Sequence, residues 1–313
     1  MLLTSSTVFV APLFFVLNIV TAYPLSDDED SAPVDLSYLG ARAFSQPDPK
    51  VGKRLEEWNS TSEMNPEELG EYAEGDIVFP SRARNGMVAQ SFRWKNGVIP
   101  YEIVGRFPAK ELDIIQRAMG IYKKVHVHYS DNTGCWSNVG RIKGKQQVNL
   151  QSPSCTTKIG TTLHELMHAA GFLHEQNRYE RDDYVSITWQ NIKKGHEANF
   201  DKADKGTTDG FGVPYDYRSV MHYSSKAFSS NGQPTIVPKD ASKVEKMGQR
   251  DGFSKGDITK INAMYKCPEK TLEVTKGNVT ESETQVANAS TEKETPSNPL
   301  VDAATGLLSF FFN

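Results

Sequence analysis

The stretch HELMHAAGFLHE, residues 164–175, decides how this chain is interpreted. On a helix, His164 and His168 lie one turn apart on the same face, so both can direct a ring nitrogen at one ion about 2.0–2.1 Å away. Gly171 can adopt a positive φ that ends the helix and lets the chain turn back, which would bring His174 to the same ion. Three protein ligands leave one position for water, an arrangement typical of a catalytic rather than a structural zinc ion.

Glu165 would lie beside that open position. Zinc lowers the pKa of bound water from about 15.7 towards 7, and a neighbouring carboxylate can accept the proton as the hydroxide attacks a carbonyl. An isolated HExxH could be an amphipathic helix with two surface histidines, but the added glycine and third histidine favour a metal site. The stretch SVMHY, residues 219–223, matches the Met-turn expected downstream. The sequence therefore predicts a zinc-dependent peptidase.

Together, HELMHAAGFLHE and SVMHY resemble the astacin family of zinc metalloendopeptidases, which belongs to the metzincin clan. The resemblance implies one Zn²⁺ ion with three histidine ligands, which are His164, His168 and His174. It implies that Glu165 is the general base and that Met221 forms an apolar floor under the metal. Tyr223 would be a fifth ligand at rest that swings away to donate a hydrogen bond to the oxyanion. The family gives no ligand role to His222.

The resemblance covers most of residues 94–267, including GVIPY at 97–101, GCWS at 134–137, RDDYV at 181–185, MGQR at 247–250 and GDI at 256–258. It implies an α+β, zincin-like catalytic domain of two subdomains. The upper one would hold a twisted mixed sheet and the zinc helix, and the lower one would be irregular.

Periodicity adds the elements themselves. We expect a strand over 98–103, helices over 110–122 and 161–170, and an edge strand over 148–151 that could pair with an extended substrate.

The N-terminus has the features of a secretory signal over residues 1–22, since residues 8–20 are almost wholly apolar and small residues follow. A membrane anchor would need a longer span of about 20 residues, so we expect no membrane span and a secreted, extracellular protein. Three sequons agree with this route, at Asn59, Asn278 and Asn288.

Residues 23–84 are acidic and short of core residues, which predicts a poorly ordered pro-segment. Within it, AEGDI at 73–77 resembles the family's F-x-G-D latency motif, with Ala73 in place of Phe. The resemblance implies that Asp76 takes the water's position on zinc; a plain turn at Gly75-Asp76 is the alternative.

The resemblance also locates an activation site. Aligning Trp94 with the mature family start places cleavage between Arg84 and Asn85, after the stretch SRAR, so we expect a trypsin-like activating protease. In the family the freed amine reaches, through water, the glutamate after the third ligand, which here is Glu175.

The chain has three cysteines. The resemblance pairs Cys135 with Cys155 and leaves Cys267 without its family partner, because the chain is shorter than the family pattern between 124 and 135. The shorter stretch could reflect a splice variant or an incorrect gene model. Alternatively, Cys267 could pair with another chain. His126 and His128 fit a strand face better than a second metal site.

The catalytic domain would therefore span 85–268, followed by a disordered tail rich in Ser, Thr and Glu over 269–313. Its apolar end, residues 307–312, is shorter than the run of about 10–20 residues that a lipid-anchor signal needs. A net charge of −4 without a basic block argues against a nucleic-acid partner, and we expect a monomer.

Two functions remain open at this point. The chain could be a secreted zinc endopeptidase, made as a zymogen, that acts on extracellular proteins or peptides. It could instead be a catalytically silent or misfolded form of the same family that acts at most as a binding or decoy protein. By resemblance, Arg250 could line the pocket after the scissile bond and favour acidic residues there; the alternative is a solvated loop arginine.

Overall fold

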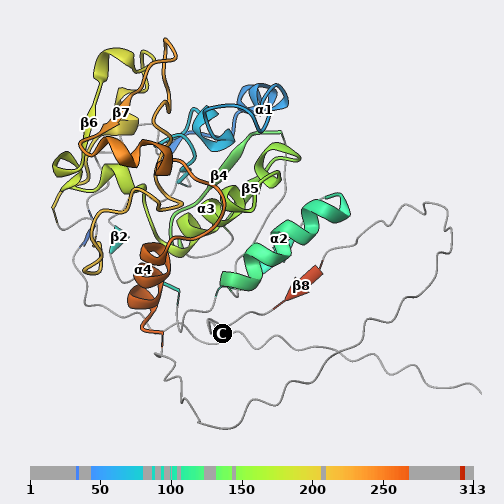
Figure 1. The fold of residues 1–313 in the computed structure, drawn as a ribbon. Coiled ribbons are helices and arrows are strands. Elements are labelled where there is room, and N and C mark those ends of the chain that lie inside the picture. The colour runs from blue at the N-terminus through green and yellow to red at the C-terminus, as the bar shows by residue number, and fades with distance from the viewer. Residues whose placement is uncertain are drawn as a thin grey trace, which may run out of the picture. The chain divides into compact units, whose positions relative to one another are not determined.

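A computed structural model describes residues 33–34, 44–79, 87–88, 93–94, 99, 101–103, 107–122, 132–142, 146–205, 209–267 and 304–306. All of them belong to one compact unit, residues 31–313 (Figure 1). Several predictions lie outside the described residues: the signal at 1–22, the cleavage site at 84–85, the sequons at 278 and 288, and the histidines at 126 and 128.

The described residues combine helices with short antiparallel strand pairs. The helices are α1 (Pro49–Glu56), α2 (Ala109–Tyr122), α3 (Ile159–Ala170) and α4 (Lys255–Tyr265). The strands are β1 (Pro33–Val34), β2 (Met87–Val88), β3 (Tyr101–Ile103), β4 (Cys135–Ser137), β5 (Val148–Leu150), β6 (Val185–Ile187), β7 (Ile236–Pro238) and β8 (Ala304–Gly306). They pair as β1–β2, β3–β8, β4–β5 and β6–β7. The expected helices near 110–122 and 161–170 are confirmed.

The upper core is built around α3, which contacts α2, β4 and β5 (Figure 1). Every residue of α3 after its first is buried. Such a helix needs partners for its last carbonyls. Gly171 ends it with φ +111° and donates to the His168 carbonyl at 2.7 Å. The Trp94 indole donates to the Ala169 carbonyl at 2.9 Å and the Tyr265 hydroxyl to that of Ala170 at 2.6 Å.

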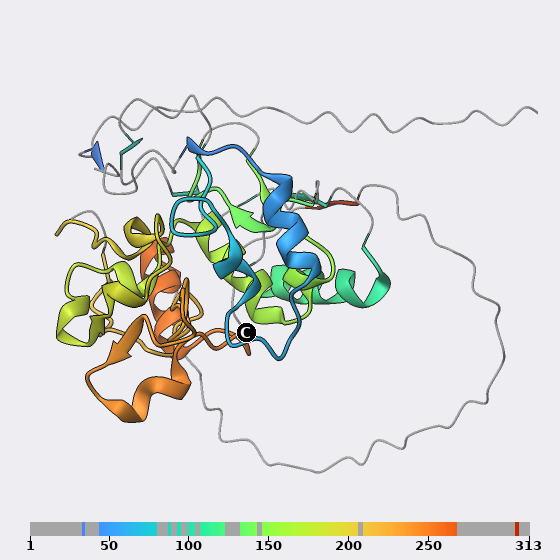
Figure 2. The same cartoon turned by 90° about the horizontal axis from the view of Figure 1, so that it is seen from above.

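The lower core lies after α3, where strands are short and 3₁₀ turns are frequent. Its buried apolar residues are Val185, Ile192, Phe200, Tyr215, Tyr223, Ala227, Phe228, Ile236 and Met247. In Figures 1 and 2 this part of the chain, with β6 and β7, lies on the opposite side of α3 from α2. An α+β fold with an irregular lower half is therefore confirmed.

Residues 44–79, called the N-terminal segment below, contradict the expectation of poor order. They contain α1, whose N-cap Asp48 accepts from the Lys50 amide at 2.9 Å, and a 3₁₀ turn at Pro66–Leu69. Val51 and Leu55 are fully buried in the upper core. The composition misled because the segment has too few apolar residues for a core of its own; it shares the core of the rest of the unit.

Two further expectations need correction or completion. Ala304–Gly306, within the predicted disordered tail, pairs antiparallel with β3 as β8, so that expectation is wrong for these residues. The disulfide between Cys135 and Cys155 is present, and Cys267 is a free, partly exposed cysteine.

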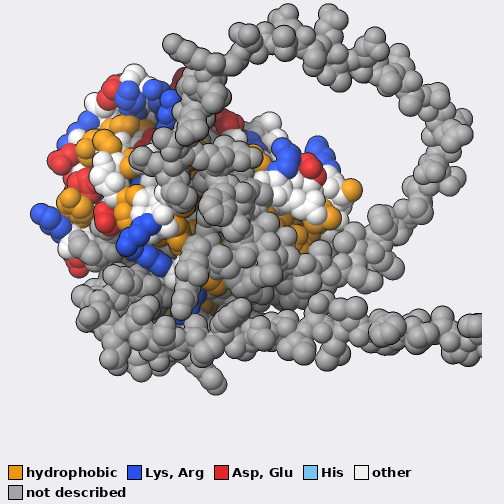
Figure 3. All heavy atoms as spheres, turned by 90° about the horizontal axis from the view of Figure 1, so that it is seen from below, with side chains coloured by type: hydrophobic (Ala, Val, Ile, Leu, Met, Phe, Trp, Pro, Cys, Tyr) orange, Lys and Arg blue, Asp and Glu red, His pale blue; other side chains and the backbone are white. Residues whose placement is uncertain are grey.

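The surface agrees with the charge balance. Where the described residues are visible in Figure 3, lysine and arginine side chains are interspersed with aspartate and glutamate. Among the described helices, none is long and apolar enough to cross a membrane. The Asn59 sequon is exposed.

Candidate metal centre

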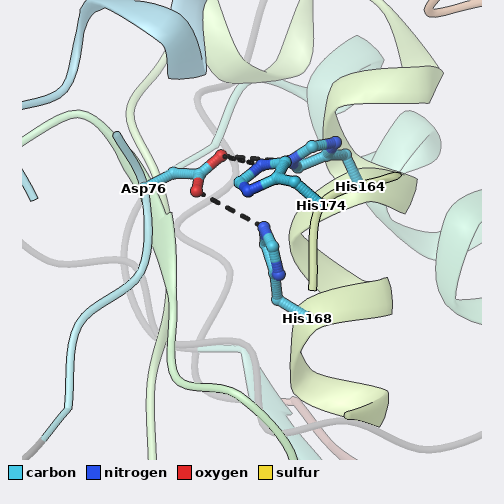
Figure 4. A group of neighbouring side chains, drawn as sticks. All are labelled: Asp76, His164, His168 and His174. Atoms are coloured by element: carbon cyan, nitrogen blue, oxygen red, sulfur yellow. Dashed lines mark hydrogen bonds and ion pairs between the residues drawn. The ribbon is translucent and has the colours of Figure 1, made fainter. Parts of the chain in front are cut away.

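Three buried histidines converge on one point, as Figure 4 shows. His164 and His168 project from α3, and the turn at Gly171 returns the chain so that His174 joins them. The side chain of Asp76, from the N-terminal segment, completes the group. One potential ligand atom from each of the four residues lies within 4.8 Å of the others. The structure thus brings together the three histidines that the sequence spacing predicted to converge.

Hydrogen bonds on the far side of each ring fix which nitrogen faces the centre. Nδ1 of His164 lies 2.7 Å from the Val220 carbonyl, and Nδ1 of His168 lies 2.7 Å from the Phe172 carbonyl. A carbonyl only accepts, so each Nδ1 is the protonated nitrogen and each Nε2 presents its lone pair to the centre. For His174 the partner of Nδ1 is the carboxylate of Glu74, at 2.6 Å.

Asp76 spans the three rings. Its Oδ2 lies 3.0 Å from Nε2 of His164 and 3.4 Å from Nε2 of His174, and its Oδ1 lies 3.4 Å from Nε2 of His168. Burial alone would raise the pKa of Asp76, but His174 and His168 hold it well below its usual value.

Asp76 Oδ1 and His168 Nε2 are buried without a hydrogen-bond partner. Three imidazoles and a carboxylate form a tetrahedral zinc donor set, and a cation here would satisfy both atoms. The residues present therefore fit Zn²⁺.

Glu165 is fully buried, and neither carboxylate oxygen has a hydrogen-bond partner. Burial, followed by the negative charges of Asp76 and Glu67, raises the pKa of Glu165 well above its ordinary value. An unpaired buried carboxyl group next to a zinc ligand on the same helix is suited to general acid–base work.

Tyr223 faces the centre from the lower core. Its ring centroid lies 4.6 Å from that of His174, and its hydroxyl donates to the Glu74 carbonyl at 2.5 Å. Met221 is buried in the upper core, and its carbonyl accepts from the Glu175 amide at 3.1 Å. His222 lies outside the cluster: its Nε2 contacts the Tyr215 hydroxyl at 2.7 Å.

The family now follows from comparison. The sequence model of the astacin peptidase family matches residues 86–266. The chain belongs to the astacin family. The nematode astacin relatives from Caenorhabditis elegans include zinc metalloproteinase nas-15, 43% identical over 189 residues, which are 56% of this chain and 32% of that protein. Zinc metalloproteinase nas-4 is 38% identical over 225 residues, covering 64% and 70%.

Among solved astacin-type structures, high choriolytic enzyme 1, a hatching enzyme zinc-protease from medaka, matches with a TM-score of 0.50 and 37% identity. The match covers 56% of this chain and 94% of that one. The chain spans less than half the length of some relatives. The match covers 32% of nas-15 and 43% of nas-13, another zinc metalloproteinase from Caenorhabditis elegans, and 56% and 59% of this chain. The three histidines and Glu165 lie inside the astacin match, whereas Glu74 and Asp76 precede it.

The N-terminal segment pairs with the astacin domain along β4. The Ser137 amide donates to the Asp76 carbonyl at 2.8 Å, and the Val78 amide donates to the Ser137 carbonyl at 3.0 Å, in a parallel bridge. β4 therefore lies between β5 and the segment. The expected strand near 148–151 is present as β5, but the extended chain of the N-terminal segment pairs with β4. Pairing of 148–151 with a substrate stays a prediction.

Sequence reasoning missed four buried charged residues that contact Arg250, His174, the Met-turn and Glu175 respectively: Glu67, Glu74, Asp257 and Lys260. Glu74 occupies the variable position of the latency motif, so the motif indicated Gly75 and Asp76 but not Glu74 itself. Arg250 is buried and pairs with Glu67, so the solvated-loop interpretation of Arg250 is wrong.

Proposed function

We propose that this chain is a secreted zinc metalloendopeptidase that is made as a zymogen and hydrolyses peptide bonds in extracellular proteins or peptides. The observation that carries the proposal is the convergence of three Nε2 atoms whose rings are oriented by hydrogen bonds, with an unpaired buried carboxyl, Glu165, beside them. Membership of the astacin family supports the same reaction.

In this proposal His164, His168 and His174 hold the ion. Bound zinc would supply an acidified water and polarise the scissile carbonyl. Glu165 accepts the proton of the attacking water and can deliver it to the leaving amine. Once its hydroxyl is released from the Glu74 carbonyl, Tyr223 donates a hydrogen bond to the oxyanion. Buried Met221 would form the apolar floor under the metal.

Latency is the second part of the proposal. Asp76 lies against all three Nε2 atoms, at the place that the water needs, and the Tyr223 hydroxyl is occupied by Glu74. Cleavage between Arg84 and Asn85 by a trypsin-like protease would separate the N-terminal segment from the domain covalently. Its departure would then free the fourth ligand position and Tyr223 together.

The silent form remains the second candidate, and it rests on Cys267, which is free and partly exposed. Cys267 nonetheless packs against the upper core, and its amide donates to the Asn262 carbonyl at 2.9 Å. An α4 that ends in an ordered turn favours the active form.

The test measures hydrolysis of a protein substrate by purified secreted protein before and after trypsin, with and without a zinc chelator. Glu165→Gln removes the base, whereas Glu245→Gln changes an exposed glutamate of the same domain and serves as the control. We expect activity only after cleavage, lost with chelator and in Glu165→Gln, and kept in Glu245→Gln. Zinc-loaded, correctly cleaved wild-type protein without activity would establish the silent form instead.

A further inference from the structure

Helix α4 carries two buried charged side chains that the proposed reaction does not use. Asp257 and Lys260 lie one turn apart, and their side chains are 0% and 4% exposed. Buried charges are costly unless they are paired and hydrogen-bonded. Their partners are therefore informative about what this helix does.

Lys260 reaches the residue that follows the third zinc ligand. Its Nζ lies 2.7 Å from Glu175 Oε2 and 3.6 Å from Asp257 Oδ1. The other Glu175 oxygen accepts from Arg178 at 2.8 Å and from the Asp216 amide at 2.8 Å. Burial by itself would lower the pKa of Lys260, but Glu175 and Asp257 raise it. The charge of Glu175 is thus balanced inside the domain.

Asp257 reaches the first zinc ligand through the Met-turn. Its Oδ2 accepts from the Val220 amide at 2.8 Å and its Oδ1 from the Ser219 hydroxyl at 2.6 Å. The carbonyl of the same Val220 accepts from Nδ1 of His164. One turn of α4 therefore contacts the neighbours of two zinc ligands. Lys260 contacts Glu175, which follows His174, and Asp257 contacts Val220, whose carbonyl accepts from His164.

We propose that Asp257 and Lys260 are positioning residues for the zinc ligands, and that Lys260, together with Arg178, is the permanent counter-charge of Glu175. The new N-terminal amine is then not needed to balance Glu175, in contrast to the role that the family resemblance implies for it. Lys260 makes its contact while the N-terminal segment is still in place. The inference rests on the proposed zinc peptidase.

The first test measures zinc affinity of the cleaved protein by competition with a chelator. Lys260→Met keeps the length of the side chain and removes the charge; Lys255→Met makes the same change at an exposed position of the same helix. We expect Lys260→Met to weaken zinc binding about 10- to 100-fold, as losses of outer partners of metal ligands do. Lys260→Arg should restore most of the affinity, and kcat should fall more than KM rises. Equal zinc affinity in Lys260→Met and Lys255→Met would overturn the proposal.

If Lys260→Met fails to fold, two other variants can be measured in its place. The double variant Glu175→Gln/Lys260→Met removes both buried charges together, and Asp257→Asn keeps the shape of the side chain. We expect both to fold and to bind zinc more weakly than Lys255→Met. Wild-type zinc affinity in the folded double variant would contradict a positioning role.

The second test concerns the amine. In Arg84→Gln, trypsin can still cleave after Arg82, which leaves two additional residues before Asn85. We expect this extended form, verified by mass spectrometry, to keep zinc affinity and kcat/KM within about twofold, as for changes that touch no buried group. A loss as large as that of Lys260→Met would overturn the proposal. Zinc-loaded wild-type protein without hydrolysis would reject the peptidase, while the ranking of zinc affinities would still decide the role of Lys260.

Discussion

The guanidinium of Arg250 pairs with the carboxylate of Glu67 across 183 positions of sequence, and both side chains are almost completely buried. Glu67 belongs to the N-terminal segment and Arg250 to the astacin domain. The Glu67 carboxylate also lies 3.4 Å from the Thr161 hydroxyl on α3. The segment is thus held by charge at a second place, separate from Asp76.

Glu67→Gln should loosen the segment in the uncleaved protein. Removing one partner of a buried ion pair costs about 3–5 kcal/mol, and Gln would recover part of this by hydrogen bonding. We expect faster trypsin cleavage and a lower melting temperature. Glu63→Gln is the matched control, since Glu63 pairs with Lys226 at 2.7 Å but is exposed, and such pairs contribute about 0–1 kcal/mol. Equal effects of the two variants would contradict an anchoring role for Glu67.

Asp76→Ala should give the uncleaved protein measurable peptidase activity, because the fourth position among the histidines becomes available to water. Asp48→Ala is the control: it removes the N-cap of α1, at a cost of about 1 kcal/mol, and leaves the histidine cluster intact. The assay is hydrolysis by protein shown to be uncleaved. Latency that persists in Asp76→Ala, with full activity after trypsin, would reject Asp76 as the blocking ligand.

Tyr223→Phe should slow the cleaved enzyme without abolishing it. Loss of one oxyanion donor costs about 2.7–4 kcal/mol, or about 10²–10³ in kcat. Tyr217→Phe loses a comparable hydrogen bond, from its hydroxyl to the Tyr184 carbonyl at 2.8 Å, and should keep kcat. Similar kcat values for the two variants would remove Tyr223 from the mechanism.

Gly171→Ala should weaken both the fold and zinc binding. Gly171 has φ +111°, where a side chain costs about 1–2 kcal/mol, although its Cβ would find space. Gly232 has φ +74° and nothing within 4 Å of an added Cβ, so Gly232→Ala controls for backbone strain. Thermal unfolding should register both changes. Only Gly171→Ala should lower zinc affinity, because it alone displaces His174.

Alkaline pH should detach the N-terminal segment through Tyr72. Burial raises the pKa of Tyr72 from 10.0 to about 12, and its hydroxyl donates to the Thr133 carbonyl at 2.7 Å. The folded state favours the neutral phenol, so its contribution to stability is complete below pH 10 and is lost as the pH rises through about 12. Other buried tyrosines, among them Tyr215 and Tyr223, also have pKa values raised by burial, so stability should fall between these pH values in every variant. Unfolding should show a steeper loss in wild type and in Tyr179→Phe than in Tyr72→Phe.

The histidine cluster could be predicted from sequence because its geometry is local. The spacing of His164 and His168 on one helix and the glycine stop at 171 determine most of it. The pair of Glu67 with Arg250 could not be predicted, since no periodicity links residues so far apart. A lysine is expected at the surface, and the burial of Lys260 becomes evident only from the packing of α4 against Glu175. The order of the N-terminal segment was missed because its apolar residues complete a core formed elsewhere.

The outer hydrogen bonds of the three histidines differ in their permanence. The partners of His164 and His168 are backbone carbonyls of the astacin domain, whereas His174 is held by Glu74 of the N-terminal segment. If activation removes that segment, the His174 ring loses its hydrogen-bond partner, whereas the rings of His164 and His168 keep theirs. We therefore expect the zinc ion to exchange faster in the mature protein than in its precursor, with His174 the first ligand to dissociate.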